Sequence, residues 1–242
     1  STLVELFGGV TPKDTRREDW HCVIYDAEGC QVAVSDVLKL HFADGFQGVP
    51  ECRQCKFTYL WAHSNTKAWS KFLLPYVGIE IDLLEIGAFE GLSTIWFANF
   101  LRPNSITCVD TWAGGDDQTG RNFELVLDDL ERRFDRNVEL AGLTAGKLVK
   151  IKSRSDMALS QLLIDHRRYH VIYVDGSHEG KDVLLDASLA VRLLHIGGIL
   201  IFDDYRHFPE VKAAIDAFAV ANSAELVQVQ DCGADQACFR KQ

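Results

Sequence analysis

The chain has 242 residues, 47% of them hydrophobic, which is enough for one large domain or for one domain with an N-terminal appendage. The formal net charge of -10 would repel phosphate backbones, and the Lys and Arg residues are scattered, so DNA and RNA are disfavoured as substrates. No apolar run reaches the roughly 20 residues that cross a bilayer, which argues against a membrane-spanning helix. We therefore expect a globular protein with a small-molecule substrate and no membrane partner.

Residues 1–56 differ in pattern from the rest of the chain and are expected to form a small N-terminal extension, in which CVIYDAEGCQVAV predicts a hairpin. Cys52 and Cys55 have the two-residue gap that lets two thiolates share a zinc ion, whereas Cys22 and Cys30 are separated by seven residues. Unpaired, partly buried thiols are the favoured interpretation, and a structural zinc site is the alternative.

The number of cysteines also indicates in which cellular compartment the protein is expected. Seven cysteines are an odd number, in a chain too large to need disulfides for stability, which favours reduced thiols and a cytoplasmic location. The chain starts at Ser1 and contains one methionine, Met157, so we expect that it was processed or cut from something longer.

From about residue 81 onward, short β-branched runs alternate with segments of helical length and period. The runs are IDLLEIG, SITCVD, KLVKIKS, YHVIYVDG and GGILIFDD. This alternation predicts a parallel sheet with helices on both faces. The final stretch, AELVQVQDCGADQACFRKQ, predicts an antiparallel hairpin around a turn at 233–235, which brings the sheet to seven strands.

Several helices carry end signals. Ser155 is placed as an N-cap, with Asp156 favourable at the positive end of the same helix. Pro209 lies where a first helical turn would open. Leu130 and Phe134 belong to one apolar stripe that starts near residue 123 on a solvated helix. Before the sheet, TYLWAHSNTKAWSKFLLPYVG predicts a helix against the first strand, with aromatics that line either a ligand pocket or the core.

The loop after the first parallel strand contains Glu85, Gly87 and Gly91 within DLLEIGAFEGLST. Ligands of open parallel sheets bind beyond the carboxyl ends of the strands, which is where this loop falls. The central glycine of a dinucleotide fingerprint is missing, so hydride transfer with NAD is disfavoured. Asp110 ends the next strand, and an acid there can accept both hydrogen bonds of a ribose diol. We therefore expect a ribose-bearing ligand without a tight pyrophosphate cradle.

Carboxylates also follow the fourth and fifth predicted strands. Asp175 ends one strand and Asp203 and Asp204 end its neighbour, so three carboxylates should meet at one rim. Like charges at close range raise one another's pKa, and Arg206 is the only basic residue close in sequence to the pair. A hard divalent cation such as magnesium or manganese would offset the repulsion among these carboxylates. Capping of helix N-termini is the alternative interpretation.

Three stretches, LLEIGAFEGLST, CVDTW and VIYVDGSHEGKDVLLDASLAVRLLHIGGILIFDDY, resemble the class I S-adenosylmethionine-dependent methyltransferases. They are most similar to the bacterial small-molecule branch that includes macrocin O-methyltransferase, and more distantly to catechol O-methyltransferase. The resemblance covers residues 57–242 and implies a Rossmann-like α/β methyltransferase domain there. It also implies that the region before the sheet acts as a lid over the acceptor or as a dimer contact in a homo-oligomer.

The resemblance implies cofactor-binding roles for the matching residues. Glu85, Gly87 and Gly91 would shape the methionine pocket. Ser93 would hydrogen-bond the cofactor carboxylate, and Asp110 would hold the ribose. The alternative for the two glycines is an ordinary tight turn with close helix packing.

The adenine would be held by residues after the next two strands. Trp112 would cover one face of the ring, while Ser155 and Asp156 would contact its edge. For Trp112, packing alone is the alternative.

At the acidic rim, the resemblance implies a divalent cation on Asp175, Asp203 and Asp204. Such an ion lowers the pKa of a coordinated hydroxyl and aligns it with the sulfonium methyl, which predicts an O-methyl product. His178 lies where catechol O-methyltransferase carries its catalytic lysine and is expected to act as general base beside Asp175. The alternative is that His178 only orders its loop.

The sequence thus predicts an S-adenosylmethionine-dependent, magnesium-assisted O-methyltransferase for a small hydroxylated molecule, such as a sugar or phenolic secondary metabolite. A metal-independent methyltransferase with the same cofactor is one alternative. A catalytically silent S-adenosylmethionine-binding module is the other, although such a module has no reason to assemble charges that repel one another.

Overall fold

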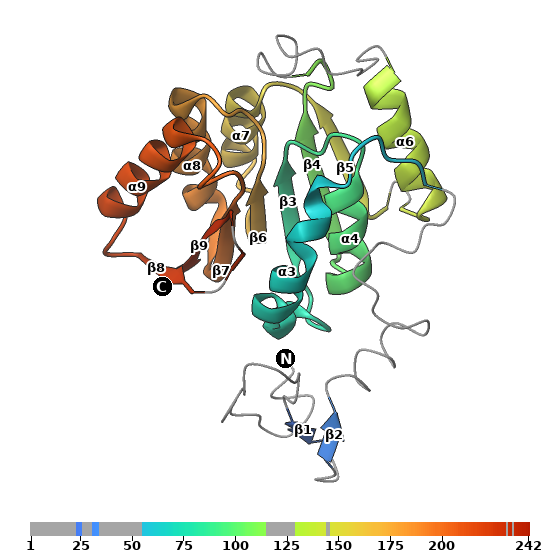
Figure 1. Ribbon diagram of the computed structural model, residues 1–242, viewed down its shortest axis with the longest axis horizontal. Helices are drawn as coiled ribbons and strands as arrows, with labels where there is room; N and C mark the ends of the chain where they lie inside the picture. The colour runs from blue at the N-terminus through green and yellow to red at the C-terminus, as the bar shows by residue number, and fades with distance from the viewer. Residues whose placement is uncertain are drawn as a thin grey trace.

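The computed structural model describes residues 23–25, 31–33, 55–114, 129–143, 146–230, 232–233 and 235–242. Their main feature is one seven-stranded sheet of order β5-β4-β3-β6-β7-β9-β8 (Figure 1). Its strands are β3 Asp82–Ile86, β4 Ser105–Asp110, β5 Leu148–Lys152, β6 Tyr169–Val174, β7 Leu194–Phe202, β8 Leu226–Val229 and β9 Ala237–Lys241. The first five are parallel, and β9 pairs antiparallel with both β7 and β8. The predicted parallel sheet and terminal hairpin are confirmed.

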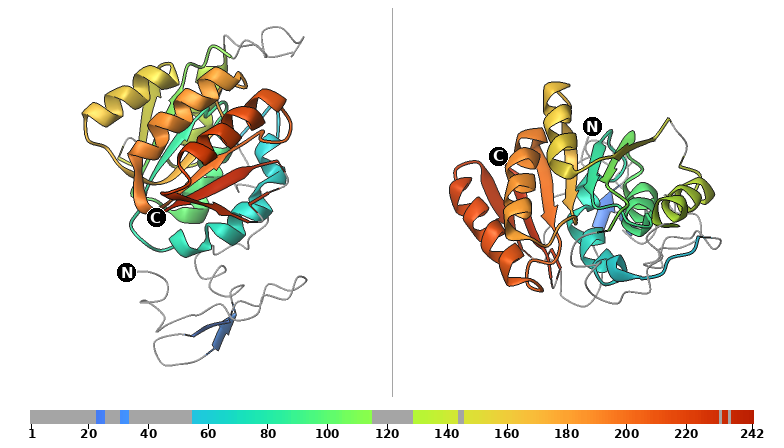
Figure 2. Two further views of the ribbon diagram at one scale, coloured as in Figure 1. Left: turned by 90° about the vertical axis from the view of Figure 1, so that its left-hand side faces the viewer. Right: turned by 90° about the horizontal axis from the view of Figure 1, so that it is seen from above.

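Helices cover both faces of the sheet, as Figures 1 and 2 show. One layer contains α3 Thr66–Phe72, α4 Leu92–Leu101 and α6 Leu130–Leu140; the other contains α7 Ser155–Ile164, α8 Gly180–Leu193 and α9 Pro209–Ala221. Because side chains alternate along a strand, Leu83 enters the core under the first layer and Leu84 the core under the second. Strands buried on both faces must be apolar almost throughout, which is why the sequence runs were continuous. Among the described helices, none has the length and apolar character to cross a bilayer.

The order of the strands places a topological switch point beside β3. The chain proceeds from β3 outward through β4 to β5, then returns to lay β6 against the other side of β3. Adjacent loops leave the carboxyl ends of β3 and β6 in opposite directions, and such a switch point is where open α/β sheets bind ligands. The backbone N–H of Asp175 donates to the Ile86 carbonyl at 2.8 Å, which ties the two strand ends together.

The helix ends agree with the sequence signals in part. Pro209 occupies the first turn of α9 and Asp156 the first turn of α7, as predicted. The N-cap of α7 is Arg154 rather than Ser155, because Ser155 already has helical geometry as the first residue of the helix. In α6 both Leu130 and Phe134 are buried; the rest of that stripe lies outside the described residues.

The segment before the sheet forms the 3-10 helix η1 Trp61–Ser64, helix α3 and the 3-10 helix η2 Leu74–Tyr76. The predicted helix is therefore present. Trp69 of α3 is fully buried and packs on Phe97 and Tyr173 with ring centroids 4.7 and 5.2 Å apart. Trp61 is instead 51% exposed. The aromatics of this segment thus divide between core and surface.

In the N-terminal extension, β1 Val23–Tyr25 pairs antiparallel with β2 Gln31–Ala33, which gives the predicted hairpin. Cys55 is disulfide-bonded, so the expectation of an unpaired thiol is wrong at this position. Its partner and the rest of the candidate zinc motif, Cys22, Cys30 and Cys52, lie outside the described residues. The extent of the N-terminal unit stays a prediction.

Candidate active site

The carboxylates predicted at the rim lie at the tips of β6 and β7. The register pairs Val174 with Phe202, so the next residues, Asp175 and Asp203, leave neighbouring strands side by side. The N–H of Asp203 donates to the Val174 carbonyl at 3.0 Å, which extends the ladder to that point. Asp204 then turns the chain with a positive φ of 56°. Two strand ends therefore deliver three acidic residues to one edge of the sheet.

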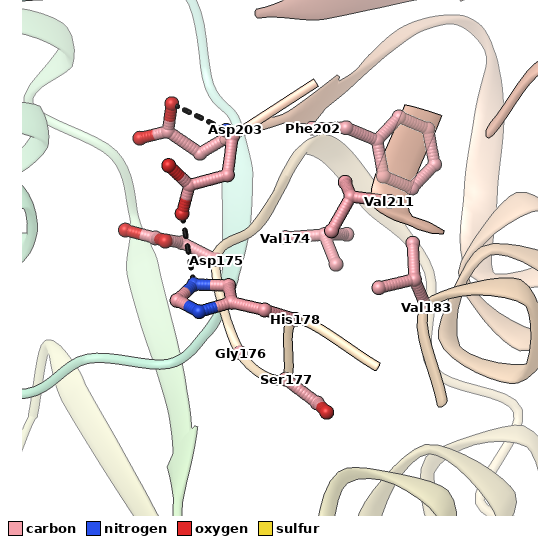
Figure 3. Close-up of a pocket in the computed structure, with 10 residues that line it drawn as sticks. Val174, Asp175, Gly176, Ser177, His178, Val183, Phe202, Asp203 and Val211 are labelled. Atoms are coloured by element: carbon pink, nitrogen blue, oxygen red, sulfur yellow. Dashed lines mark hydrogen bonds and ion pairs between the residues drawn. The ribbon is translucent and has the colours of Figure 1, made fainter. Parts of the chain in front are cut away.

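Asp175, Asp204 and His178 form one cluster of possible metal ligands. One possible ligand atom from each lies within 4.8 Å of the others, and His178 Nε2 is 2.8 Å from Asp204 Oδ2. The imidazole also stacks on Phe208, with centroids 4.3 Å apart. In Figure 3 the acidic groups and the imidazole lie on one side of a pocket of about 230 Å³, a volume that includes open solvent. The apolar residues that face them are Val174, Val183, Phe202 and Val211.

Asp203 has a different set of neighbours. Its Oδ2 accepts from the Tyr173 hydroxyl at 2.5 Å and from Asn65 Nδ2 at 3.1 Å, and its Oδ1 accepts from the Asp204 N–H at 2.9 Å. The Tyr173 hydroxyl is also 3.0 Å from Asp175 Oδ2. A hydroxyl has one hydrogen to donate, so the two carboxylates compete for it.

Neither of these partners is predicted from the sequence. Tyr173 could have been found, because it lies two residues before Asp175 and shares its face of the strand. Asn65 carries no such signal, since 138 residues separate it from Asp203.

The electrostatics of the rim fit a cation. Burial raises the pKa of Asp175 well above its ordinary value, and the charges of Asp203 and Asp204 add to this shift. Burial also raises the pKa of Asp203, against the opposing effect of the Tyr173 hydrogen bond. In the described part of the chain no Lys or Arg forms an ion pair with these residues, and His178 is their one basic contact. Oxygen donors with uncompensated charge are the donor set that Mg²⁺ and Mn²⁺ prefer.

The loop after β3 packs directly on this rim. Gly87 has a φ of +87°, and a Cβ there would lie 1.8 Å from the Asp175 carbonyl oxygen, so only glycine fits. Gly91, with a φ of +84°, stands at the N-cap of α4, and a Cβ would meet the Phe134 ring at 3.2 Å. Gly87 thus brings the predicted cofactor loop against the acidic tip of β6, and Gly91 brings the start of α4 against α6.

Glu85 holds the start of α4 to β3. It is fully buried and accepts hydrogen bonds from the hydroxyls of Ser93 and Thr94. Burial raises its pKa to about 7. Ser93 was expected to donate to a cofactor carboxylate, but the structure directs its single hydroxyl hydrogen to Glu85. Glu85 therefore shapes the loop from beneath, and the role expected of Ser93 has no support from its geometry.

Asp110 is held by the backbone on either side of it. Its Oδ2 accepts from the Phe89 N–H at 2.8 Å and its Oδ1 from the Trp112 N–H at 2.7 Å. Burial nevertheless raises the pKa of this carboxyl. Each oxygen keeps a second lone pair, which is what a ribose diol would need.

Trp112 is 3% exposed and tightly packed. Its Nε1 donates to the Phe89 carbonyl at 2.9 Å, its ring lies 4.9 Å from that of Phe134, and Lys150 Nζ stands 4.7 Å over it. These contacts favour the packing alternative over a ring face open to adenine.

The residues expected at the adenine edge also have partners of their own. Ser155 lies near the buried Asp186 and lowers its pKa, which burial nevertheless raises to about 6. Asp156 pairs with Arg154 at 3.2 Å, and this hydrogen bond lowers the pKa of Asp156. The contacts of Ser155 and Asp156 with adenine stay predictions.

Comparisons with known proteins bear on the family. A family model described as a methyltransferase domain matches residues 84–205, about half of the chain. Comparison with curated protein sequences found no match.

Solved structures share the fold at low sequence identity. The O-methyltransferase NovP has a TM-score of 0.55 at 18% identity, covering 68% of this chain and 73% of its own. An O-methyltransferase from Bacillus cereus in complex with SAH has a TM-score of 0.52 at 18% identity, with 84% and 87% covered. MycE, solved with Mg, SAH and mycinamycin VI, reaches 0.50 at 14% identity, with 86% and 54% covered. Other matches include two rRNA methylases, so the fold does not choose the acceptor.

The family model covers both the loop after β3 and the acidic rim. The strand order and the terminal hairpin agree with this match. The chain belongs to the class I S-adenosylmethionine-dependent methyltransferases.

Proposed function

We propose that the protein transfers the methyl group of S-adenosylmethionine to a hydroxyl oxygen of a small molecule, assisted by a divalent cation. The observation that carries this proposal is the meeting of Asp175, Asp203 and Asp204 beside the loop of Gly87, without a Lys or Arg partner in the described part of the chain. A hard cation at this edge of the sheet would complete its coordination shell with oxygen ligands, and an acceptor hydroxyl can supply one of them.

The cofactor would lie across the carboxyl ends of β3 and β4. Gly87 and Gly91 would leave room for its methionine part, with Glu85 holding the loop in place, and the free lone pairs of Asp110 would take the ribose hydroxyls. The complex of the Bacillus cereus enzyme with SAH supports this assignment at the level of the fold.

Asp175, Asp203 and Asp204 are the residues we assign to the cation, magnesium or manganese. When bound, such an ion lowers the pKa of a coordinated hydroxyl and orients it. MycE, with magnesium in its structure, supports the assignment. Charge repulsion among the three carboxylates would be relieved by the ion.

His178 is our candidate for the general base. Its Nε2 lies 2.8 Å from Asp204 Oδ2, and the imidazole would accept the proton of the acceptor hydroxyl. Asp204 would stabilise the imidazolium that forms. Removing the base should reduce kcat about 100-fold, so a His178→Ala variant within a few fold of wild type at saturating acceptor would move this role elsewhere.

The acceptor we propose is a small hydroxylated molecule, a sugar or phenolic group of a secondary metabolite. The net charge of -10 disfavours RNA as an alternative. A cytoplasmic location and a lid or dimer contact in the N-terminal extension belong to the same proposal.

The test is methyl transfer from labelled S-adenosylmethionine to a panel of phenols and sugars, with and without chelator. We expect transfer to oxygen that chelation abolishes and magnesium or manganese restores. The pairing of His178 with Asp204 favours a metal-independent enzyme as a second candidate, because it could deprotonate a hydroxyl alone. Full turnover in excess chelator would select that candidate, and no transfer to any hydroxyl would end the proposal.

A further inference from the structure

Asp203 is held by a residue that is distant in the sequence and lies before the sheet. This residue is Asn65, at the junction of η1 and α3, only 7% exposed and with its Nδ2 3.1 Å from Asp203 Oδ2 and 3.4 Å from Oδ1. The Asn65 carbonyl accepts from the N–H groups of Ala68 and Trp69 at 3.0 and 2.9 Å. The backbone of Asn65 is therefore anchored in the first turn of α3, and its amide is aimed at the carboxylate.

A second amide, that of Gln236, lies in the turn before β9 and is 3% exposed. Trp69 Nε1 donates to Gln236 Oε1 at 2.7 Å. An indole N–H can only donate, so it selects the oxygen of the amide and turns Nε2 away from the tryptophan. That Nε2 is buried and makes no hydrogen bond with any described residue, although the Gln236 amide interacts with the Asp203 carboxylate.

Asn65 and Trp69 lie one helical turn apart on the same side of α3. Side chains from a single turn at the start of α3 therefore donate hydrogen bonds to both Asp203 and the amide of Gln236. The Asn65 amide is a neutral donor, so it orients the Asp203 carboxylate without neutralising the charge that a cation needs.

We propose that Asn65 is a positioning residue for metal binding, which holds the Asp203 carboxylate toward the rim, and that the nearby Gln236 amide supports it. This inference rests on the proposed function. The segment before the sheet is accordingly part of the metal site, because docking of α3 sets the direction of one of its carboxylates. Residues that orient metal ligands in this way typically change metal affinity roughly 10- to 100-fold when removed.

The experiment measures Mn²⁺ binding to the full chain by electron paramagnetic resonance, at saturating S-adenosylhomocysteine. We expect Asn65→Leu, which keeps volume but removes both donors, to weaken Mn²⁺ binding at least 10-fold. The affinity for S-adenosylhomocysteine without metal, measured by calorimetry, should stay within twofold, because a merely structural loss would weaken both ligands. A Gln236→Met variant should weaken Mn²⁺ binding by about 3- to 10-fold, and unchanged binding overturns the part assigned to Gln236.

Asn222→Leu is the matched control. Asn222 is a partly buried asparagine whose Nδ2 donates to the Phe218 carbonyl at 2.8 Å, at the end of α9 remote from the rim. This variant should bind Mn²⁺ as wild type does. An equal loss in Asn222→Leu would make the effect a general one and overturn the inference.

The outcomes separate this inference from the proposed function. Wild-type protein that binds no Mn²⁺ overturns both, whereas tight binding by wild type and by Asn65→Leu alike overturns the inference alone. Should leucine at position 65 prevent folding, Asn65→Ala removes the donors without adding bulk. At least fivefold weaker Mn²⁺ binding with intact S-adenosylhomocysteine binding then supports the inference, and binding within twofold of wild type overturns it.

Discussion

The loop after β3 and the acidic rim beside it satisfy their polar groups in opposite ways. In the loop, Glu85 receives two side-chain hydroxyls and Asp110 receives two backbone N–H groups, so each carboxylate is stabilised from within the protein. At the rim, Asp175 and Asp203 compete for the single hydrogen of Tyr173. The first region is preorganised by its own hydrogen bonds, whereas in the second the proposed cation would relieve the competition between the two carboxylates.

The contact between the loop and the rim is where we expect a single substitution to have its largest effect. Gly87→Ala would place a Cβ 1.8 Å from the Asp175 carbonyl oxygen, at a φ of +87° that disfavours any side chain. We expect a loss of about 4 kcal/mol or more in the free energy of unfolding, measured by urea denaturation. Gly142→Ala is the control, because Gly142 has a φ of +74° with no atom within 4 Å of a Cβ. It should cost about 1 kcal/mol from backbone strain alone. Equal losses in the two variants would contradict the close packing of loop on rim.

At the rim, removing one charge should separate cation binding from cofactor binding. Asp175→Asn keeps the shape of the side chain but removes its charge, so we expect kcat to fall about 1000-fold, equivalent to about 4 kcal/mol. Affinity for S-adenosylhomocysteine, measured by calorimetry, should change less than threefold, because the loop keeps its own hydrogen bonds. Asp165→Asn, at an exposed position after α7, is the control and should leave kcat unchanged. A large loss of S-adenosylhomocysteine affinity in Asp175→Asn would show that the loop and the rim bind the cofactor together.

In the loop, the buried Glu85 makes stability depend on pH. Its pKa is raised by burial from an ordinary 4.5 to about 7, so between these values the folded state keeps a proton that the unfolded state has released. Stability must therefore fall as pH rises through this window, by about 3 kcal/mol at most, and no further above it. Thermal unfolding of wild type and Glu85→Gln at pH 5 and pH 8 checks this, since the variant should lack that part of the fall. The same pH dependence in both proteins would mean that Glu85 ionises normally.

The smallest effect expected is at Trp112. Trp112→Phe keeps an aromatic ring against Phe134 but loses the hydrogen bond to the Phe89 carbonyl, which should cost about 1 kcal/mol of stability. If the packing interpretation is right, the affinity for S-adenosylhomocysteine stays within threefold. A loss above 10-fold would instead favour a direct contact between the indole and the cofactor.

The sequence alone determined the order of strands and helices and the residues that stand at the strand ends. These features depend on local periodicity and on the handedness of strand–helix–strand units, both of which are short-range properties. Gly87, Gly91, Asp110 and Asp175 were therefore found at their correct positions. The hairpin at the end of the chain was found for the same reason.

Only the tertiary structure decided which partner each polar side chain takes. Ser93 could donate to a cofactor or to Glu85, and its packing on β3 selected Glu85. Asn65 meets Asp203 across 138 residues, and no period in the sequence encodes such a distance. A hydrogen bond depends on fractions of an ångström between elements that are packed together only once the whole sheet has formed.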